Sequence, residues 1–61
     1  MVNEDRIGSS VDDLLAAAYY NRGVAYYNQN DIPRMCRDFE KACRLGDCEA
    51  LEWAKKEGYC R

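Results

Sequence analysis

The sequence predicts an all-α fold, a mini-domain of three helices. Apolar residues recur at helical spacing in two stretches, and a turn-like segment over residues 30–33 separates them. A third, shorter stretch of the same kind begins after Gly46. The chain has 61 residues, which is enough for one domain. We therefore expect a single helical domain over residues 10–61, preceded by a flexible lead-in over residues 1–9.

The first helix is predicted from Val11 to about Gln29. Ser10 and Asp13 approximate a capping box, and acidic residues suit the positive end of a helix dipole. The polar run 28–31 should end the helix. The stripe that we expect to face the core consists of Leu14, Leu15, Ala18, Tyr19, Arg22, Ala25 and Tyr26.

The second helix is predicted from about Pro33 to Leu45. Proline fits the first turn of a helix, and the glycine that follows Leu45 is typical of a helix end. Its apolar residues recur at helical spacing and should face the first helix. They are Met35, Phe39 and Ala42.

The third helix is predicted over about residues 48–57, with Asp47 as its N-cap. Lysines near its end suit the negative end of the helix dipole. We expect Leu51, Ala54 and Trp53 to pack against the second helix.

Aromatic residues and a glycine mark the first two helices at a recognisable spacing. Tyr19, Gly23 and Tyr26 are followed by Phe39 in the second helix, and Trp53 stands one repeat length after Tyr19. This pattern resembles the tetratricopeptide repeat, a helix-turn-helix unit of 34 residues. Gly23, which has no side chain, would let the two helices approach closely.

The match to that repeat is incomplete at three positions. Arg22 and Met35 depart from the pattern, and Asp47 stands where a proline usually closes the unit. Cysteines on both sides of the turn at Asp47 add a looser similarity to the cysteine-bearing Sel-like repeats. The resemblance implies one repeat followed by a C-terminal capping helix.

The resemblance also implies a binding surface. In solenoids of this class, the first helix of each repeat lines the concave face that holds a protein or peptide. On this chain the implied surface is Tyr20, Asn21, Val24, Tyr27 and Asn28. The same exposed stripe would equally serve as a packing face or as a homodimer contact.

The four cysteines allow three pairings. Cys36 and Cys43 are separated by about 10 Å along one helix axis, whereas a disulfide needs α-carbons within about 7 Å. An antiparallel third helix brings Cys48 beside Cys43 and Cys60 beside Cys36. The expected disulfides are therefore Cys36–Cys60 and Cys43–Cys48.

Other uses of these cysteines stay open. Free buried thiols would act as small apolar residues. A four-thiolate zinc site or a redox pair is also conceivable, although the spacing lacks a Cys-x2-Cys motif. Paired cysteines would favour a periplasmic or secreted parent protein, because disulfides persist in oxidising compartments.

Composition excludes several classes of function. The net charge is −2 with no basic stripe, so we expect no nucleic-acid partner. No window is long and apolar enough to cross a membrane, and the polar N-terminus has no signal-peptide core. Histidine is absent, which removes the commonest general base. We expect no catalytic site, cofactor or metal.

The function predicted from these observations is a non-catalytic module for protein–protein interaction or scaffolding. Its partner would be a protein or peptide, including a second copy of the chain bound through the first helix. One alternative is a structural C-terminal cap, or an isolated or engineered fragment of a longer repeat protein without its own ligand. The other is a thiol redox or zinc module.

Overall fold

Three helices form the part of the chain that the computed structural model describes, which is the backbone of residues 3–61 and the side chains of residues 13–61. They are α1 (Asn3–Asn28), α2 (Ile32–Arg44) and α3 (Glu49–Lys56). No strand occurs within residues 3–61, and the predicted all-α fold is confirmed.

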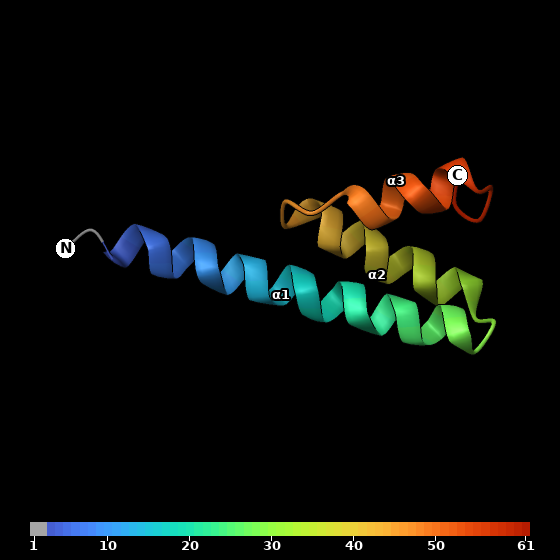
Figure 1. Cartoon of the computed structure of the whole chain (residues 1–61), viewed down its shortest axis with the longest axis horizontal. Coiled ribbons are helices and arrows are strands. Elements are labelled where there is room, and N and C mark those ends of the chain that lie inside the picture. The colour runs from blue at the N-terminus through green and yellow to red at the C-terminus, as the bar shows by residue number, and fades with distance from the viewer. Residues whose placement is uncertain (1–2) are drawn as a thin grey trace.

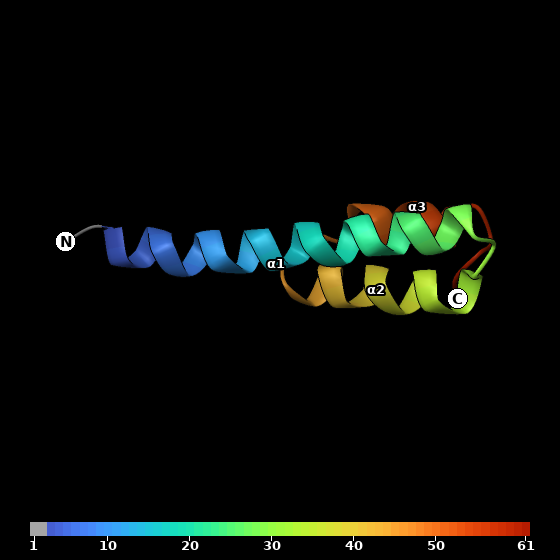
Figure 2. The ribbon, with the colours of Figure 1, turned by 90° about the horizontal axis from the view of Figure 1, so that it is seen from below.

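The helices run up, down and up, and α2 packs against both of its neighbours (Figure 1). Seen from below, α1 and α3 lie at one level and α2 at the other (Figure 2). Helix α2 therefore lies beneath the surface between α1 and α3. This arrangement positions the candidate site.

Helix α1 has 26 residues and α2 has 13, so α1 continues well past the end of α2 (Figure 1). It begins at Asn3, and the predicted start at Val11 is wrong. Capping signals such as the one at Ser10 are local, and extending an existing helix costs little because each added residue gains a backbone hydrogen bond. The expected lead-in over residues 1–9 is thus helical from Asn3 onward.

The turns around α2 follow the sequence signals closely. The Asp31 carboxylate accepts a hydrogen bond from the backbone N–H of Arg34, and a proline occupies the first turn. At the other end Gly46 has a φ of 110°, a conformation that glycine adopts without strain. Helix α3 starts within one residue of its predicted position, but Cys48 and not Asp47 occupies the N-cap.

The core is built on Phe39, which is the most buried aromatic side chain among residues 13–61. It packs against Gly23, where an added Cβ would lie 2.5 Å from the Phe39 Cε1 atom. Glycine therefore allows the close approach of α1 and α2, as its place in the sequence predicts. The other buried apolar residues are Ala16, Met35, Ala42, Ala50, Leu51, Ala54 and Cys60.

The predicted inner stripe of α1 is largely wrong. Leu14 is 69% exposed, and Leu15, Ala18, Arg22 and Ala25 are exposed as well. The buried positions are instead Ala16 and Gly23, and of the predicted stripe only Tyr19 and Tyr26 are half-buried. Ala16 and Gly23 lie seven positions apart on one face of α1, and this face packs on α2. The predicted stripe is rotated about the helix axis away from that contact.

Two disulfides hold α3 against α2, Cys36–Cys60 and Cys43–Cys48, and they are the two expected pairs. The first joins residues 24 positions apart and should stabilise the fold by roughly 3–4 kcal/mol on the chain-entropy model. Helix α3 has 8 residues, too few to be stable alone in water. Its position therefore depends on these links and on its buried residues.

Candidate binding groove

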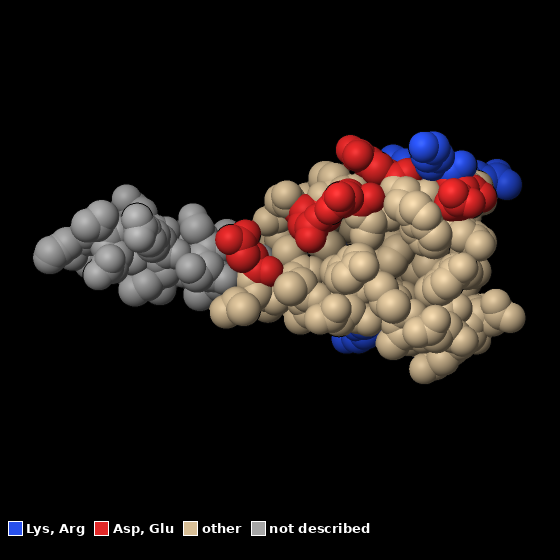
Figure 3. Space-filling model, viewed as in Figure 1, with Lys and Arg blue, Asp and Glu red and all other residues tan. Residues whose placement is uncertain are grey.

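A cavity of about 570 Å³ opens between α1 and α3, with α2 as its floor. We call it the aromatic groove. Figure 3 views this face, where uncharged side chains cover the middle and acidic groups lie toward the α2–α3 turn and also near the C-terminal end of α3. The lining residues are Tyr20, Val24, Tyr27, Phe39, Asp47, Glu49, Ala50 and Trp53.

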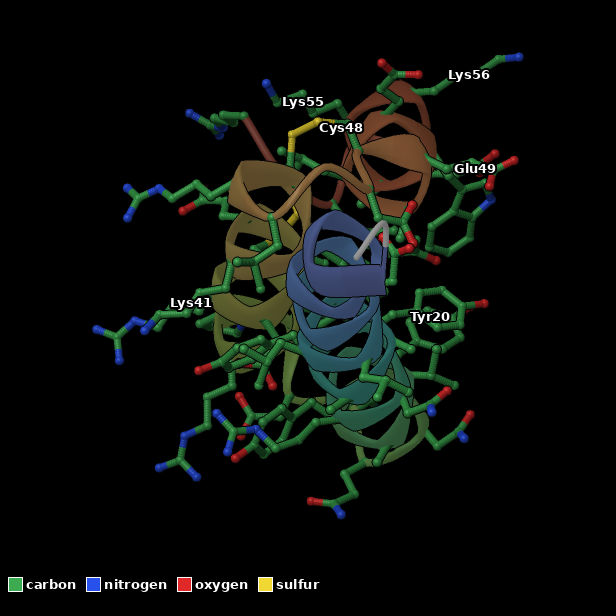
Figure 4. The ribbon with its side chains drawn as sticks, turned by 90° about the vertical axis from the view of Figure 1, so that its left-hand side faces the viewer. Tyr20, Lys41, Cys48, Glu49, Lys55 and Lys56 are labelled. Atoms are coloured by element: carbon green, nitrogen blue, oxygen red, sulfur yellow. A yellow bond between two sulfur atoms is a disulfide. The ribbon has the colours of Figure 1, made fainter. Side chains whose placement is uncertain are left out.

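Helical spacing places the α1 side of the groove. Tyr20, Val24 and Tyr27 lie four and then three positions apart, so they share one face of α1. Glu49 and Trp53 are likewise one turn apart on α3. In Figure 4 Tyr20 and Glu49 point to the same side of the molecule, and Lys41 points to the opposite side.

Ring contacts fix the orientation of the aromatic side chains. Tyr20 stacks on Phe39 with ring centroids 5.9 Å apart and an interplanar angle of 18°. Tyr27 packs edge-on against Trp53 at 5.7 Å and against Tyr59 at 5.6 Å. Each such pair contributes about 0.5–1.5 kcal/mol beyond area burial. The groove is thus held in shape before anything binds.

Tyr59 is tied to the groove through Tyr27. Hydrogen bonding with Tyr27 raises the pKa of the Tyr59 phenol above its ordinary value, and the negative charge of Glu57 adds to the effect. The raised pKa means that the folded structure favours the neutral phenol of Tyr59.

The charged groups that line the groove have one sign. Asp47 and Glu49 are carboxylates, and among residues 13–61 no lysine or arginine contributes to the lining. Neither carboxylate forms an ion pair among residues 13–61. One end of an otherwise apolar groove is therefore negative.

On another face of α1, which we call the closed face, a cation of the chain is already paired with a carboxylate and with tyrosine rings. Arg22 donates from Nε to Asp38 Oδ2 at 2.7 Å and from Nη2 to Asp38 Oδ1 at 3.2 Å. The Asp38 side chain is only 5% exposed, so Arg22 pairs with a buried carboxylate. Pairing with Asp38 raises the pKa of Arg22, which also lies over the rings of Tyr19 and Tyr26.

The structure separates the residues of the predicted binding surface into two groups. Tyr20, Val24 and Tyr27 line the groove. Asn21 and Asn28 are exposed beside it but do not line it.

Sequence reasoning missed the floor and the α3 side of the groove. Trp53 was expected in the core, yet it is 41% exposed. A signal was present in the sequence, because Ala50 and Trp53 share a helical face beside the one that carries Leu51 and Ala54. The missed residues are Phe39, Asp47, Glu49, Ala50 and Trp53.

The sulfur atoms of all four cysteines are used in the two disulfides. A thiolate zinc site is incompatible with this oxidised form, because zinc binds deprotonated thiols. Within the described residues no group of three or more potential metal-binding side chains comes together. The helices of the described part also contain no segment that is both long and apolar enough to span a bilayer.

A scan against protein-family models and searches of curated proteins and of solved structures found no match to this chain.

Proposed function

We propose that this chain is a non-catalytic interaction module that binds a peptide segment of a partner protein in the aromatic groove. The observation that carries the proposal is the exposure of large aromatic rings along one preformed groove. Tyr20, Tyr27, Trp53 and Tyr59 all belong to the exposed large apolar residues. Tyrosine and tryptophan are enriched among the residues that dominate binding energy at protein interfaces.

The dimensions of the groove support a peptide rather than a flat protein surface. Its volume of about 570 Å³ falls in the usual range for ligand sites and accommodates a few side chains. The rings are already packed against one another, and α3 is covalently attached to α2. The groove therefore loses little conformational freedom when a ligand binds.

The resemblance to tetratricopeptide repeats supports the same proposal. In that class the first helix of a repeat and the first helix of the next line the concave face, and here the corresponding helices would be α1 and α3. The two walls of the aromatic groove lie on these helices. The assignment to that class is part of the proposal.

Panning a random heptapeptide phage library on the oxidised protein tests this function. We expect clones whose binding is lost with Tyr20→Ala or Trp53→Ala and is kept with Asn21→Ala, since Asn21 is exposed just outside the lining. Circular dichroism checks that each variant is folded. A library that yields no groove-dependent clone contradicts the proposal.

A structural cap is the second candidate, and the uncovered leucines favour it. Leu14 is 69% exposed and Leu15 is 45% exposed, and a preceding helix pair of a repeat array would cover such apolar side chains. A homodimer through α1 would also cover apolar surface.

Sedimentation of the parent and of a Tyr20→Lys, Tyr27→Lys variant separates these candidates. A groove-mediated dimer dissociates in that variant, whereas association through the leucines persists.

A further inference from the structure

We propose that the aromatic groove selects a peptide segment that presents an arginine or lysine side chain. The cation would lie against the rings of Tyr20 and Trp53 and pair with the carboxylates of Glu49 and Asp47. This inference deepens the proposed function and rests on it, because it names the chemistry of the segment that the groove accepts.

The lining of the groove combines the two groups that attract an organic cation. An ammonium or guanidinium group within about 6 Å of an aromatic ring is attracted by the negative face of the ring, and tryptophan is the best of the rings. Carboxylates add charge-assisted hydrogen bonds. The groove offers Tyr20, Tyr27 and Trp53 beside Asp47 and Glu49, and none of the described basic residues lines it.

The other face of α1 shows that this chemistry operates in the same molecule. Arg22 lies 5.6 Å from the centroid of the Tyr19 ring and forms two hydrogen bonds to the carboxylate of Asp38. Lys41 lies 5.5 Å from the centroid of the Tyr19 ring. Within residues 13–61 no lysine or arginine makes such a contact with Tyr20, Tyr27 or Trp53.

The carboxylates at the negative end of the groove have no basic side chain paired with them. Asp47 and Glu49 are two positions apart and line the same cavity, and neither has an ion-pair partner among the described residues. A bound cation would be attracted by both carboxylates. In Figure 4 the side chains of Tyr20 and Glu49 lie on the same side of the molecule.

The apolar part of the groove favours a peptide over a small free cation. Val24, Phe39 and Ala50 line the same cavity as the carboxylates. These three side chains would contact an aliphatic residue next to the basic residue of the peptide. A free ammonium ion would make no apolar contact with them. Arginine should bind better than lysine, because its planar guanidinium group both stacks on rings and pairs with two carboxylate oxygens.

The test starts from the groove-dependent clones of the heptapeptide library. We expect these clones to be enriched in arginine and lysine relative to the input library. In a synthetic peptide of the tightest clone, the basic residue is replaced by citrulline for arginine or by norleucine for lysine. Citrulline is the neutral, nearly isosteric counterpart of arginine. Titrations follow the fluorescence of Trp53, which is the single tryptophan of the chain.

The neutral peptide should bind about tenfold more weakly, and the difference should shrink at high salt. An Asp47→Asn, Glu49→Gln variant should lose most of the preference for the cation. Glu52→Gln is the matched control, because Glu52 is an exposed carboxylate on α3 outside the groove lining, and it should keep the preference.

Groove-dependent clones without basic residues, or equal affinity for the charged and neutral peptides, would overturn the inference and leave the proposed function standing. Tetramethylammonium that binds as tightly as the peptide would also overturn it, since the ligand would then be a small cation. A library without any groove-dependent clone would overturn both proposals.

Discussion

Two pairs of adjacent tyrosines, Tyr19–Tyr20 and Tyr26–Tyr27, divide between two different faces of α1, because neighbouring helical residues are about 100° apart around the axis. Tyr19 and Tyr26 lie beside Arg22, whose guanidinium group is bonded to buried Asp38. Tyr20 and Tyr27 line the aromatic groove. Neighbouring tyrosines therefore have different surroundings. One of each pair contacts a cation of the chain itself, and the other lines a groove that is open to solvent.

The comparison separates stability from binding in physical terms. On the closed face the cation, the rings and the carboxylate all belong to the chain, so their attraction stabilises the fold. On the groove face the chain supplies the rings and the carboxylates, and the proposed partner supplies the cation. Changes on the first face should therefore alter the free energy of unfolding, and changes on the second should alter affinity.

Phe39→Ala should have the largest effect, because Phe39 is both the most buried aromatic residue of the described side chains and part of the groove lining. It packs against Gly23 and stacks on Tyr20. Loss of a buried phenylalanine costs about 3–5 kcal/mol, which is comparable to the whole stability of a domain of this size. Denaturant unfolding followed by circular dichroism measures the loss. Cooperative melting near the parent temperature would show that Phe39 does not support the core.

Removing the long disulfide should affect the groove and spare the closed face. In a Cys36→Ser, Cys60→Ser variant we expect a loss of roughly 3–4 kcal/mol and the release of α3 from α2. Hydrogen exchange should show lost protection at Leu51 and Ala54, while α1 and α2 keep theirs. A variant that retains protection in α3 would mean that packing alone holds this wall of the groove.

Arg22→Met should act on the closed face alone. It leaves the carboxylate of Asp38 buried without its partner, so the free energy of unfolding should fall while peptide affinity in the groove stays unchanged. Arg34→Met is the control, because Arg34 pairs with the more exposed Asp31 and should matter less. Equal effects of the two variants would show that the burial of Asp38 has no energetic consequence.

The smallest expected effect concerns the pKa of Tyr59 and the pH dependence of stability that follows from it. The pKa of Tyr59 is raised, so its neutral form is favoured in the folded state. The resulting stability is present below the ordinary tyrosine pKa of about 10 and is lost as the pH rises through the raised value. Ultraviolet difference titration of the parent and of Tyr27→Phe measures this shift. Tyr27→Phe should lower the pKa of Tyr59 toward its ordinary value, and an unchanged pKa would contradict the role of Tyr27.

Local signals account for the parts of the fold that were predicted from the sequence. Pro33 and Gly46 mark the ends of α2, and helix geometry selects the two disulfides. The inner stripe of α1 was mispredicted because α1 carries more than one apolar stripe, and the packing of α2 decides which of them is covered. The covered face holds Ala16 and Gly23, whereas Leu14 and Leu15 lie outside it.

Only one wall of the candidate site was predicted from the sequence. The spacing of Tyr20, Val24 and Tyr27 defines one wall, but Trp53 and the acidic end depend on how α3 is oriented against α2. Burial of Asp38 was also missed, because its partner Arg22 lies 16 positions away in the sequence. Tertiary pairing of this kind has no local signal.

The disulfides also give residues 36–60 the topology of a closed covalent ring, with the link between Cys43 and Cys48 as a shortcut across it. A linear chain falls into two pieces when one peptide bond is cut, whereas this ring only opens. Proteolytic cleavage at Lys55 or in the α2–α3 turn would add the mass of one water molecule and release no fragment until a reductant is added. The segment that carries the α3 wall of the groove is thereby protected against loss by a single cut.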